Sequence, residues 1–229
     1  MARALTRTET AAMSDLRDMG AVALATLAIG LAACGGDGDD TTTTREASKG
    51  EAPPNVVNVD RFLLQKDEEP GFRPGALPGA MPDSRETITG VEAFVQDLGL
   101  PPAEEKRLRS EGFVSFTVAP IRGPRTAGLS NVALYMTGEG AQRSLAHELR
   151  PGVIRRSGPV ENLRFFPVPG IPGARGWTAS VGGPHDVGNV YWSQGRCMLT
   201  LGNQGPGPLA GPLSKGARAI YQRTDGACP

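Results

Sequence analysis

The first 55 residues divide into a short apolar run and a polar stretch, and neither can contribute much to a folded core. Residues 19–33 are apolar and uncharged, but the run is shorter than the roughly 20 residues that a membrane-spanning helix needs. Residues 35–54 are polar and contain four consecutive threonines, a composition typical of a flexible tether. The chain is therefore expected to fold over residues 56–229 as one domain of ordinary size.

Cys34 lies at the junction of these two stretches, directly after Leu31, Ala32 and Ala33. This pattern resembles the signal peptide and lipobox of a bacterial lipoprotein, in which the cysteine thiol receives a diacylglyceryl group. The resemblance implies that residues 1–33 are a signal peptide and that residues 34–55 are the lipidated cysteine and its tether. Acyl chains such as palmitate would then hold the protein at the cell membrane, facing the extracellular side.

Two readings of this leader remain open. The apolar run could instead be a buried helix or an ordinary secretory peptide with an incidental cysteine. The start of translation is also open, because Met1, Met13 and Met19 each give a leader with a different number of charges.

The overall charge balance bears on the class of partner. The chain has 24 basic and 24 acidic side chains, so no basic surface is predicted and nucleic acid is not expected as a partner. The content of 31 Gly and 20 Pro is typical of a GC-rich genome, as in actinobacteria.

The remaining two of the three cysteines form an even pair if Cys34 carries lipid. In an oxidising compartment we expect Cys197 and Cys228 to form a disulfide. Such a bridge would attach the C-terminus to a predicted strand. The alternative is two free thiols, one of them in a strand and the other at the chain end.

Apolar spacing predicts an α+β domain. Helices are predicted at 87–98, 102–110, 139–149 and 209–223. Strands are predicted at 112–120, 129–137, 163–168 and 177–181, with a hairpin at 188–193 and 196–202. The stretches 182–188 and 202–208 are predicted to be loops. We expect an antiparallel sheet with helices packed on one face or around its ends, and the strand–strand–helix order of 112–149 returns over 163–223.

Few residues are candidates for a functional site. His185 and Asp186 are neighbours in a predicted loop and could act as a general base or ligand pair, but such loops are more often simple turns. Trp177 and Trp192 could bind a sugar or an acyl chain, and the alternative is that both belong to the core. The sequence contains no Gly-x-Ser-x-Gly or P-loop motif, so we expect no catalysis, no cofactor and no metal site.

Several short stretches resemble uncharacterised actinobacterial surface lipoproteins. They are the lipobox with its tether and residues 62–72, 168–174, 188–192 and 220–228. The order of elements also resembles the extracytoplasmic sensor-type domains of mycobacterial lipoproteins and receptor kinases. The resemblance implies a lipid-anchored envelope protein that binds or senses an unidentified ligand or partner without catalysis. The alternative is an envelope hydrolase or transferase that uses the loop with His185 and Asp186.

Overall fold

A computed structural model of the chain describes residues 57–65, 68, 73–74, 85–122, 127–182 and 185–228, and every structural statement below concerns these residues. The predicted signal peptide, the lipidation residue Cys34 and the tether lie outside them.

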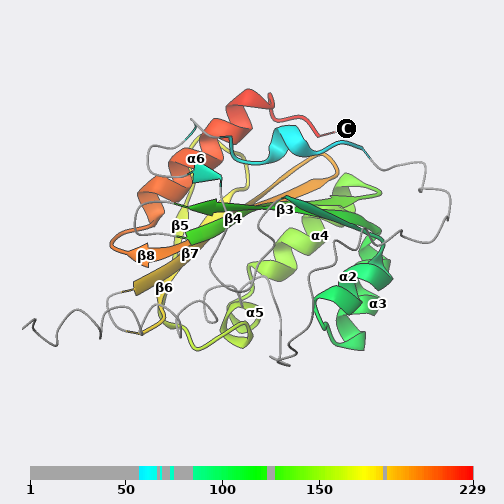
Figure 1. The fold of residues 1–229 in the computed structure, drawn as a ribbon, viewed down its shortest axis with the longest axis horizontal. Helices are drawn as coiled ribbons and strands as arrows, with labels where there is room; N and C mark the ends of the chain where they lie inside the picture. The colour runs from blue at the N-terminus through cyan, green and yellow to red at the C-terminus, as the bar shows by residue number, and fades with distance from the viewer. Residues whose placement is uncertain are drawn as a thin grey trace, which may run out of the picture.

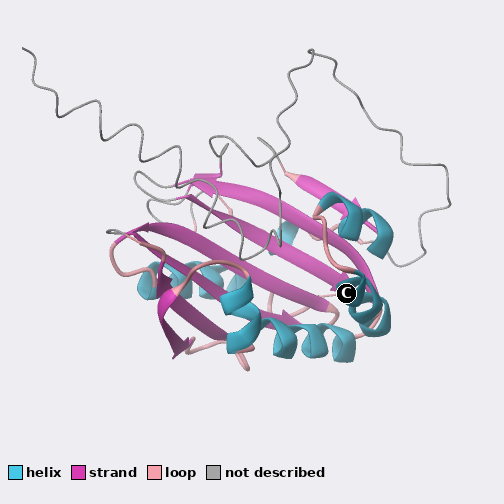
Figure 2. Cartoon of the chain, turned by 90° about the horizontal axis from the view of Figure 1, so that it is seen from below, coloured by secondary structure: helices cyan, strands magenta, loops and turns pink. Residues whose placement is uncertain are grey.

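An eight-stranded sheet forms the middle of the domain (Figures 1 and 2). Its strands are β1 (Arg73–Pro74), β2 (Glu86–Thr89), β3 (Phe113–Arg122), β4 (Ala127–Tyr135), β5 (Glu161–Pro167), β6 (Arg175–Ser180), β7 (His185–Gln194) and β8 (Cys197–Pro206). The order across the sheet is β1-β3-β4-β8-β7-β6-β5, and β2 also pairs with β3. All pairs are antiparallel, so the predicted α+β class with an antiparallel sheet is confirmed.

Helices cover both faces of this sheet, whereas one face or the ends were expected (Figure 1). The helices on one face are α2 (Val91–Asp97), α3 (Pro102–Glu111), α4 (Gly138–Glu148) and α5 (Pro151–Arg156). The other face carries α6 (Ala210–Arg223) and the short 3-10 helix η2 (Asp60–Phe62). We call these the α2–α5 face and the α6 face. Among the described residues, no helix has the length and apolarity to cross a bilayer.

Each face of the sheet has its own core, because successive side chains along a strand point to opposite faces. On the α6 face, Trp192 and Leu199 pack with Leu213 and Ile220 of α6. On the α2–α5 face lie the residues Phe94, Phe113, Phe116, Tyr135, Trp177, Tyr191 and Met198. Tyr191 and Trp192 therefore lie on opposite faces, as adjacent positions in a strand require.

The helix predicted at 87–98 is wrong in its first turn. Residues Glu86–Thr89 instead form β2, whose Ile88 lies opposite Phe116 of β3. Gly90 ends the strand with a φ of 89° and donates its N–H to the carbonyl of Val114. The helix α2 starts only after this glycine, because a positive φ is incompatible with a continuous α-helix.

Both predicted loops beside the hairpin are also partly strand. β7 begins at His185 and β8 continues to Pro206, because each of these ends has a partner strand with which to share its hydrogen bonds. Helix α5 is absent from the predicted elements. A proline directly after the helix predicted at 139–149 is typical of a helix end, but Pro151 occupies the first turn of a new helix. The helices that follow β4 and β8 lie on opposite faces of the sheet, so the two halves are not related by a simple repeat.

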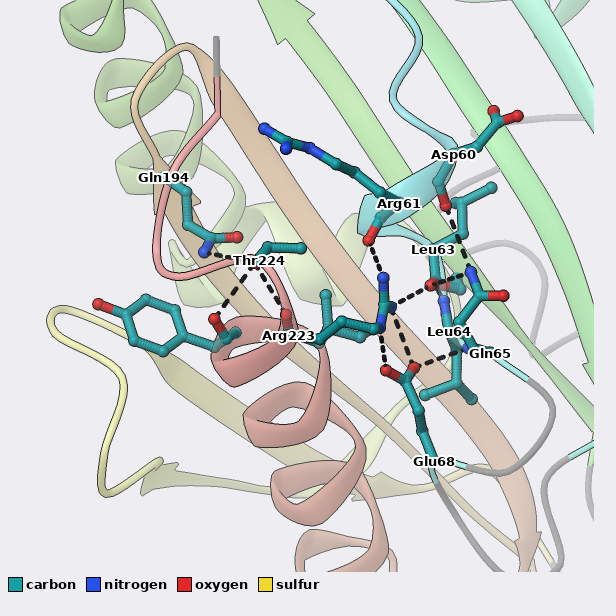
Figure 3. A network of polar contacts seen from close by, with 12 residues as sticks. Asp60, Arg61, Leu63, Leu64, Gln65, Glu68, Gln194, Arg223 and Thr224 are labelled. Carbon is teal, nitrogen blue, oxygen red and sulfur yellow. Dashed lines mark hydrogen bonds and ion pairs between the residues drawn. The ribbon is translucent and has the colours of Figure 1, made fainter.

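The first and last segments that the structure describes are held on the α6 face. Cys197 and Cys228 form the predicted disulfide. Figure 3 shows the guanidinium of Arg223, at the end of α6, between Glu68 and the carbonyls of Arg61 and Leu63. The segment 57–65, which we call the N-terminal strap, is therefore bound to the last helix. Phe62 in this strap is fully buried.

Candidate functional site

Five buried residues with polar side-chain atoms lie on the α2–α5 face of the sheet, and we call them the polar floor. They are Asn131 on β4, Thr200 on β8, Asn189 and Tyr191 on β7, and Trp177 on β6. Thr200 lies opposite both Asn131 and Tyr191, while Asn189 lies opposite Trp177. Directly opposite residues have Cα atoms about 4.5–5.5 Å apart, so these side chains form one continuous region.

Several polar atoms of this floor have no hydrogen-bond partner among the described residues. Both Asn131 side-chain polar atoms, Nδ2 and Oδ1, are unpaired, as are Nδ2 of Asn189 and Nε1 of Trp177. Asn131 and Asn189 are each only 2% exposed. An unpaired buried polar group costs about 1–3 kcal/mol, so this concentration on one face requires an explanation.

Gly202 of β8 makes room for one of these amides. It lies opposite Asn189, and a Cβ atom built on it would come within 2.2 Å of the Asn189 Oδ1 atom. Any larger residue at this position would displace the amide. Glycine at position 202 of β8 thus leaves the space that the Asn189 side chain of β7 occupies.

An ion cluster joins α3 to α4 above this side of the sheet. Arg107 of α3 contacts Glu104 at 2.7 Å, Glu111 at 2.7 Å and Glu148 of α4 at 3.4 Å. Its Nη1 also donates to Ser144 Oγ at 3.2 Å. We call these five residues the Arg107 cluster. Three carboxyl groups thus share one guanidinium.

The close contact between α3 and α4 depends on Gly140 in the first turn of α4. A Cβ atom there would come within 2.0 Å of the Glu111 carbonyl oxygen. Thr137 caps the same helix end by accepting a hydrogen bond from Gly140 N–H at 3.1 Å. Gly140 thus permits the close approach of α4 to α3, and Thr137 stabilises the first turn of α4.

Tyr135 links the Arg107 cluster to the sheet. Its hydroxyl lies 2.6 Å from Ser144 Oγ, and the ring is 1% exposed. Burial raises the pKa of Tyr135, so the phenol stays neutral and can share a proton with the serine. The contact attaches α4 to β4 as well as to α3.

Glu148 and Tyr191 connect the cluster to the polar floor. Protein atoms surround the Glu148 carboxyl, although 24% of its side-chain surface still reaches solvent, and this burial raises its pKa to about 7. Burial also raises the pKa of Tyr191, and the nearby Glu148 charge raises it further. The neighbouring Trp177 indole lowers the pKa of Tyr191 and so partly offsets this rise. The geometry between the two side chains is not that of a hydrogen bond, and the Trp177 Nε1 atom has no partner.

His147 lies beside the same cluster. Its Nε2 is 3.7 Å from Glu104 Oε1, while burial and the Arg107 charge lower the pKa of its imidazole. Within the described part of the chain, no group of three His, Cys, Asp or Glu side chains is placed to hold a metal ion.

Trp177 and Trp192, the two candidate ligand-binding tryptophans, are fully buried on opposite faces of the sheet. Trp192 lies on the α6 face, where its indole Nε1 donates to Gln194 at 3.1 Å. Trp177 lies on the polar floor. The structure therefore does not bring them together, and only Trp177 lies beside unpaired polar groups.

His185 and Asp186 are neighbours in β7, so their side chains point to opposite faces of the sheet. Asp186 accepts a hydrogen bond from Ser180 at 3.3 Å. Asp186 is thus oriented by a serine on β6, and the pair does not form the histidine–carboxylate arrangement of a catalytic triad.

Sequence reasoning missed Asn131, Asn189 and the Arg107 cluster. The signal available was an asparagine in the middle of each of two strongly apolar strands, at 129–135 and 187–192. Polar residues at such positions are rare unless they are paired or functional.

Comparisons with known proteins give a likeness to a solved structure. No protein-family model matches the chain, and no curated protein matches it. The structure is similar to the extracellular domain of PknH from Mycobacterium tuberculosis, a mycobacterial receptor kinase. The likeness covers 72% of this chain and 93% of that chain, with 12% identity and a TM-score of 0.45. We transfer no residue role from it.

Proposed function

We propose that this protein is a lipid-anchored envelope protein, and that its described domain is a non-enzymatic binding or sensing module. The ligand binds on the α2–α5 face, at the polar floor. Lipid on Cys34 holds the protein at the membrane, with the domain on the extracellular side. The anchor is supported by the lipobox pattern, and the binding role by the polar floor.

The observation that carries the binding role is the Asn131 side chain. Both polar atoms of its amide are buried and unpaired, and an amide in that state destabilises the fold. A leucine or valine at this strand position would pack without such a cost. Retaining an asparagine there is understandable if a ligand supplies the missing hydrogen bonds.

The binding role is tested with the full chain purified from membranes of an actinobacterial host. Its thermal unfolding is compared with and without the dialysable fraction of an envelope extract. Because a ligand that binds the native state raises its stability, we expect a higher unfolding temperature for the wild type and no change for Asn131→Leu. Asn203→Leu is the matched control, since Asn203 is also a buried asparagine with an unpaired Nδ2 but belongs to the opposite side of β8. The proposal is wrong if the extract leaves the wild type unchanged, or stabilises Asn131→Leu equally.

The anchor is tested separately with Cys34→Ser. The thiol is the only group in this stretch that can form a thioether to diacylglyceryl. The wild type should partition into detergent and incorporate labelled fatty acid, and the variant should do neither. Equal partitioning and equal mature mass for the two proteins would contradict the lipoprotein assignment.

A further inference from the structure

We infer that the polar floor recognises a neutral, oxygen-rich ligand with the chemistry of an uncharged sugar. This inference rests on the binding role proposed above and names the class of ligand. It is drawn from the number of free donors and acceptors, the charge around the floor and the rings that border it.

Free donors outnumber free acceptors on the floor. The unpaired donors are Nδ2 of Asn131, Nδ2 of Asn189 and Nε1 of Trp177, whereas the one unpaired acceptor is Oδ1 of Asn131. An amide nitrogen carries two N–H bonds and an indole nitrogen carries one. The complementary ligand must therefore present several acceptor oxygens and at least one donor, which is the pattern of hydroxyl and ring-ether groups.

The charge near the floor disfavours an anion. Glu148 acts electrostatically on Tyr191 of the floor. The Arg107 guanidinium is already engaged by Glu104, Glu111, Glu148 and Ser144, so it is not available to a phosphate or a carboxylate. Arg107 therefore offers an anionic ligand no charge-assisted hydrogen bond, and the excess of donors disfavours a cation. A neutral ligand remains.

Aromatic rings border the amides. Trp177 lies directly opposite Asn189, and Tyr191 lies opposite Thr200 in the next row towards Asn131. Aromatic side chains bind flat, partly apolar surfaces, and a pyranose ring offers such a surface together with hydroxyl groups at its edge. Amides beside aromatic rings therefore match a sugar better than they match a purely apolar or a purely ionic molecule.

Binding at this position requires α4 to move. The helix packs against β7 and β8, and the floor amides beneath the helices are almost fully buried. The Arg107 cluster and the Tyr135–Ser144 contact hold α4 in place. The ligand therefore enters by an opening motion of α4, and its affinity includes the cost of that motion.

The test uses isothermal titration calorimetry on the full chain. The neutral probes are glucose, galactose, mannose and N-acetylglucosamine, and the anionic probes are glucuronate and glucose 6-phosphate. We expect saturable binding of at least one neutral sugar and binding of its anionic counterpart that is about tenfold weaker or more. Asn131→Leu and Asn189→Leu should each lower the affinity about tenfold, the loss that one hydrogen bond of ordinary strength gives. Asn203→Leu should bind as the wild type does.

The variants must unfold cooperatively, which circular dichroism verifies. No binding of any neutral sugar, equal binding of the anionic probes, or an unchanged affinity of both asparagine variants would each overturn the inference. If the envelope extract stabilises the wild type but no sugar binds, the ligand class is wrong and the binding role stands. If the extract also has no effect, the binding role itself fails.

Discussion

The two faces of the sheet differ in how completely their buried polar groups are hydrogen-bonded. On the α6 face, Trp192 donates to Gln194, and Gln194 donates to Thr224, whose hydroxyl donates to the Ile220 carbonyl. On the α2–α5 face, the Trp177 indole N–H and the amides of the polar floor have no such chain of partners. Trp177 and Trp192 are thus equally buried, but only the indole N–H of Trp192 has a hydrogen-bond partner.

This difference agrees with the proposal that the α6 face stabilises the domain and the α2–α5 face binds the ligand. The α6 face combines an apolar core, the disulfide and the N-terminal strap, all of which favour a fixed structure. The α2–α5 face carries the ion cluster, the raised Glu148 pKa and the unpaired amides. Functional sites commonly retain polar groups that cost stability. The comparison therefore supports the proposal that the ligand binds on the α2–α5 face.

The largest expected effect comes from breaking the Arg107 cluster. Arg107→Met leaves Glu111, which is 6% exposed, and Glu148 without their cationic partner. Loss of one partner of a buried ion pair costs about 3–5 kcal/mol, measured by urea unfolding. Arg109→Met is the matched control, because Arg109 lies on the exposed surface of α3, where it pairs with Glu92 of α2 and Glu105 of α3. Exposed pairs of this kind contribute little to stability. Similar losses for the two variants would show that the cluster is not a structural link between α3 and α4.

Removal of the disulfide should cost nearly as much on the α6 face. The bridge joins residues separated by 31 positions, and a loop of that length corresponds to about 3–4 kcal/mol of unfolded-state entropy. The double variant Cys197→Ser, Cys228→Ser should lose this amount in urea unfolding and retain sugar binding. Lost binding in a folded double variant would contradict the separation of the two faces.

The ionisation of Glu148 should make stability depend on pH. Its pKa is raised from 4.5 to about 7 in the folded state, so between these values the folded protein holds a proton that the unfolded chain has released. The resulting stability is fully present below pH 4.5 and is lost as pH rises towards 7, by up to about 3 kcal/mol.

Glu148→Gln isolates this effect. The difference in unfolding free energy between wild type and variant should change across that pH window. The variant retains His147, whose lowered pKa makes the free energy of unfolding rise with pH instead of falling. Because both proteins contain His147, its contribution cancels in the difference between them. A pH-independent difference between the two proteins would show that burial does not perturb Glu148.

The smallest expected effect is a gain in stability. Asn131→Leu removes two unpaired polar atoms from the core, so the free energy of unfolding should rise by about 1–2 kcal/mol. Asn203→Leu on the other side of β8 should give no such gain, because it removes the side-chain Oδ1 of Asn203, which accepts a hydrogen bond from the Gln204 N–H at 2.9 Å. Equal changes for the two variants would remove the distinction between the faces.

Much of the fold followed from local pattern. The helix predicted at 102–110 is α3, because Pro102 suits the first turn and Gly112 adopts a φ of 74° at the end. The hairpin of β7 and β8 followed from apolar strands around a short turn. β2 was missed, because the spacing of Thr87 and Ile88 also fits a helix, and only pairing with β3 decides between the two.

The candidate site could not be found in the same way. His185 and Trp192 were singled out by residue type, yet neither belongs to the polar floor. Asn131 and Asn189 come from strands that are not neighbours in the sheet, and β8 lies between them. No local spacing indicates that two such residues will share one face beneath one helix.

The sequence by itself determined the α+β class and the pairing of Cys197 with Cys228. These features depend on local composition, periodicity and the number of cysteines. The tertiary structure decided which helices cover which face, how Arg107 meets Glu148, and which buried amides remain unpaired. Such features depend on contacts between segments far apart in the chain, and their energies arise only when the sheet and helices pack together.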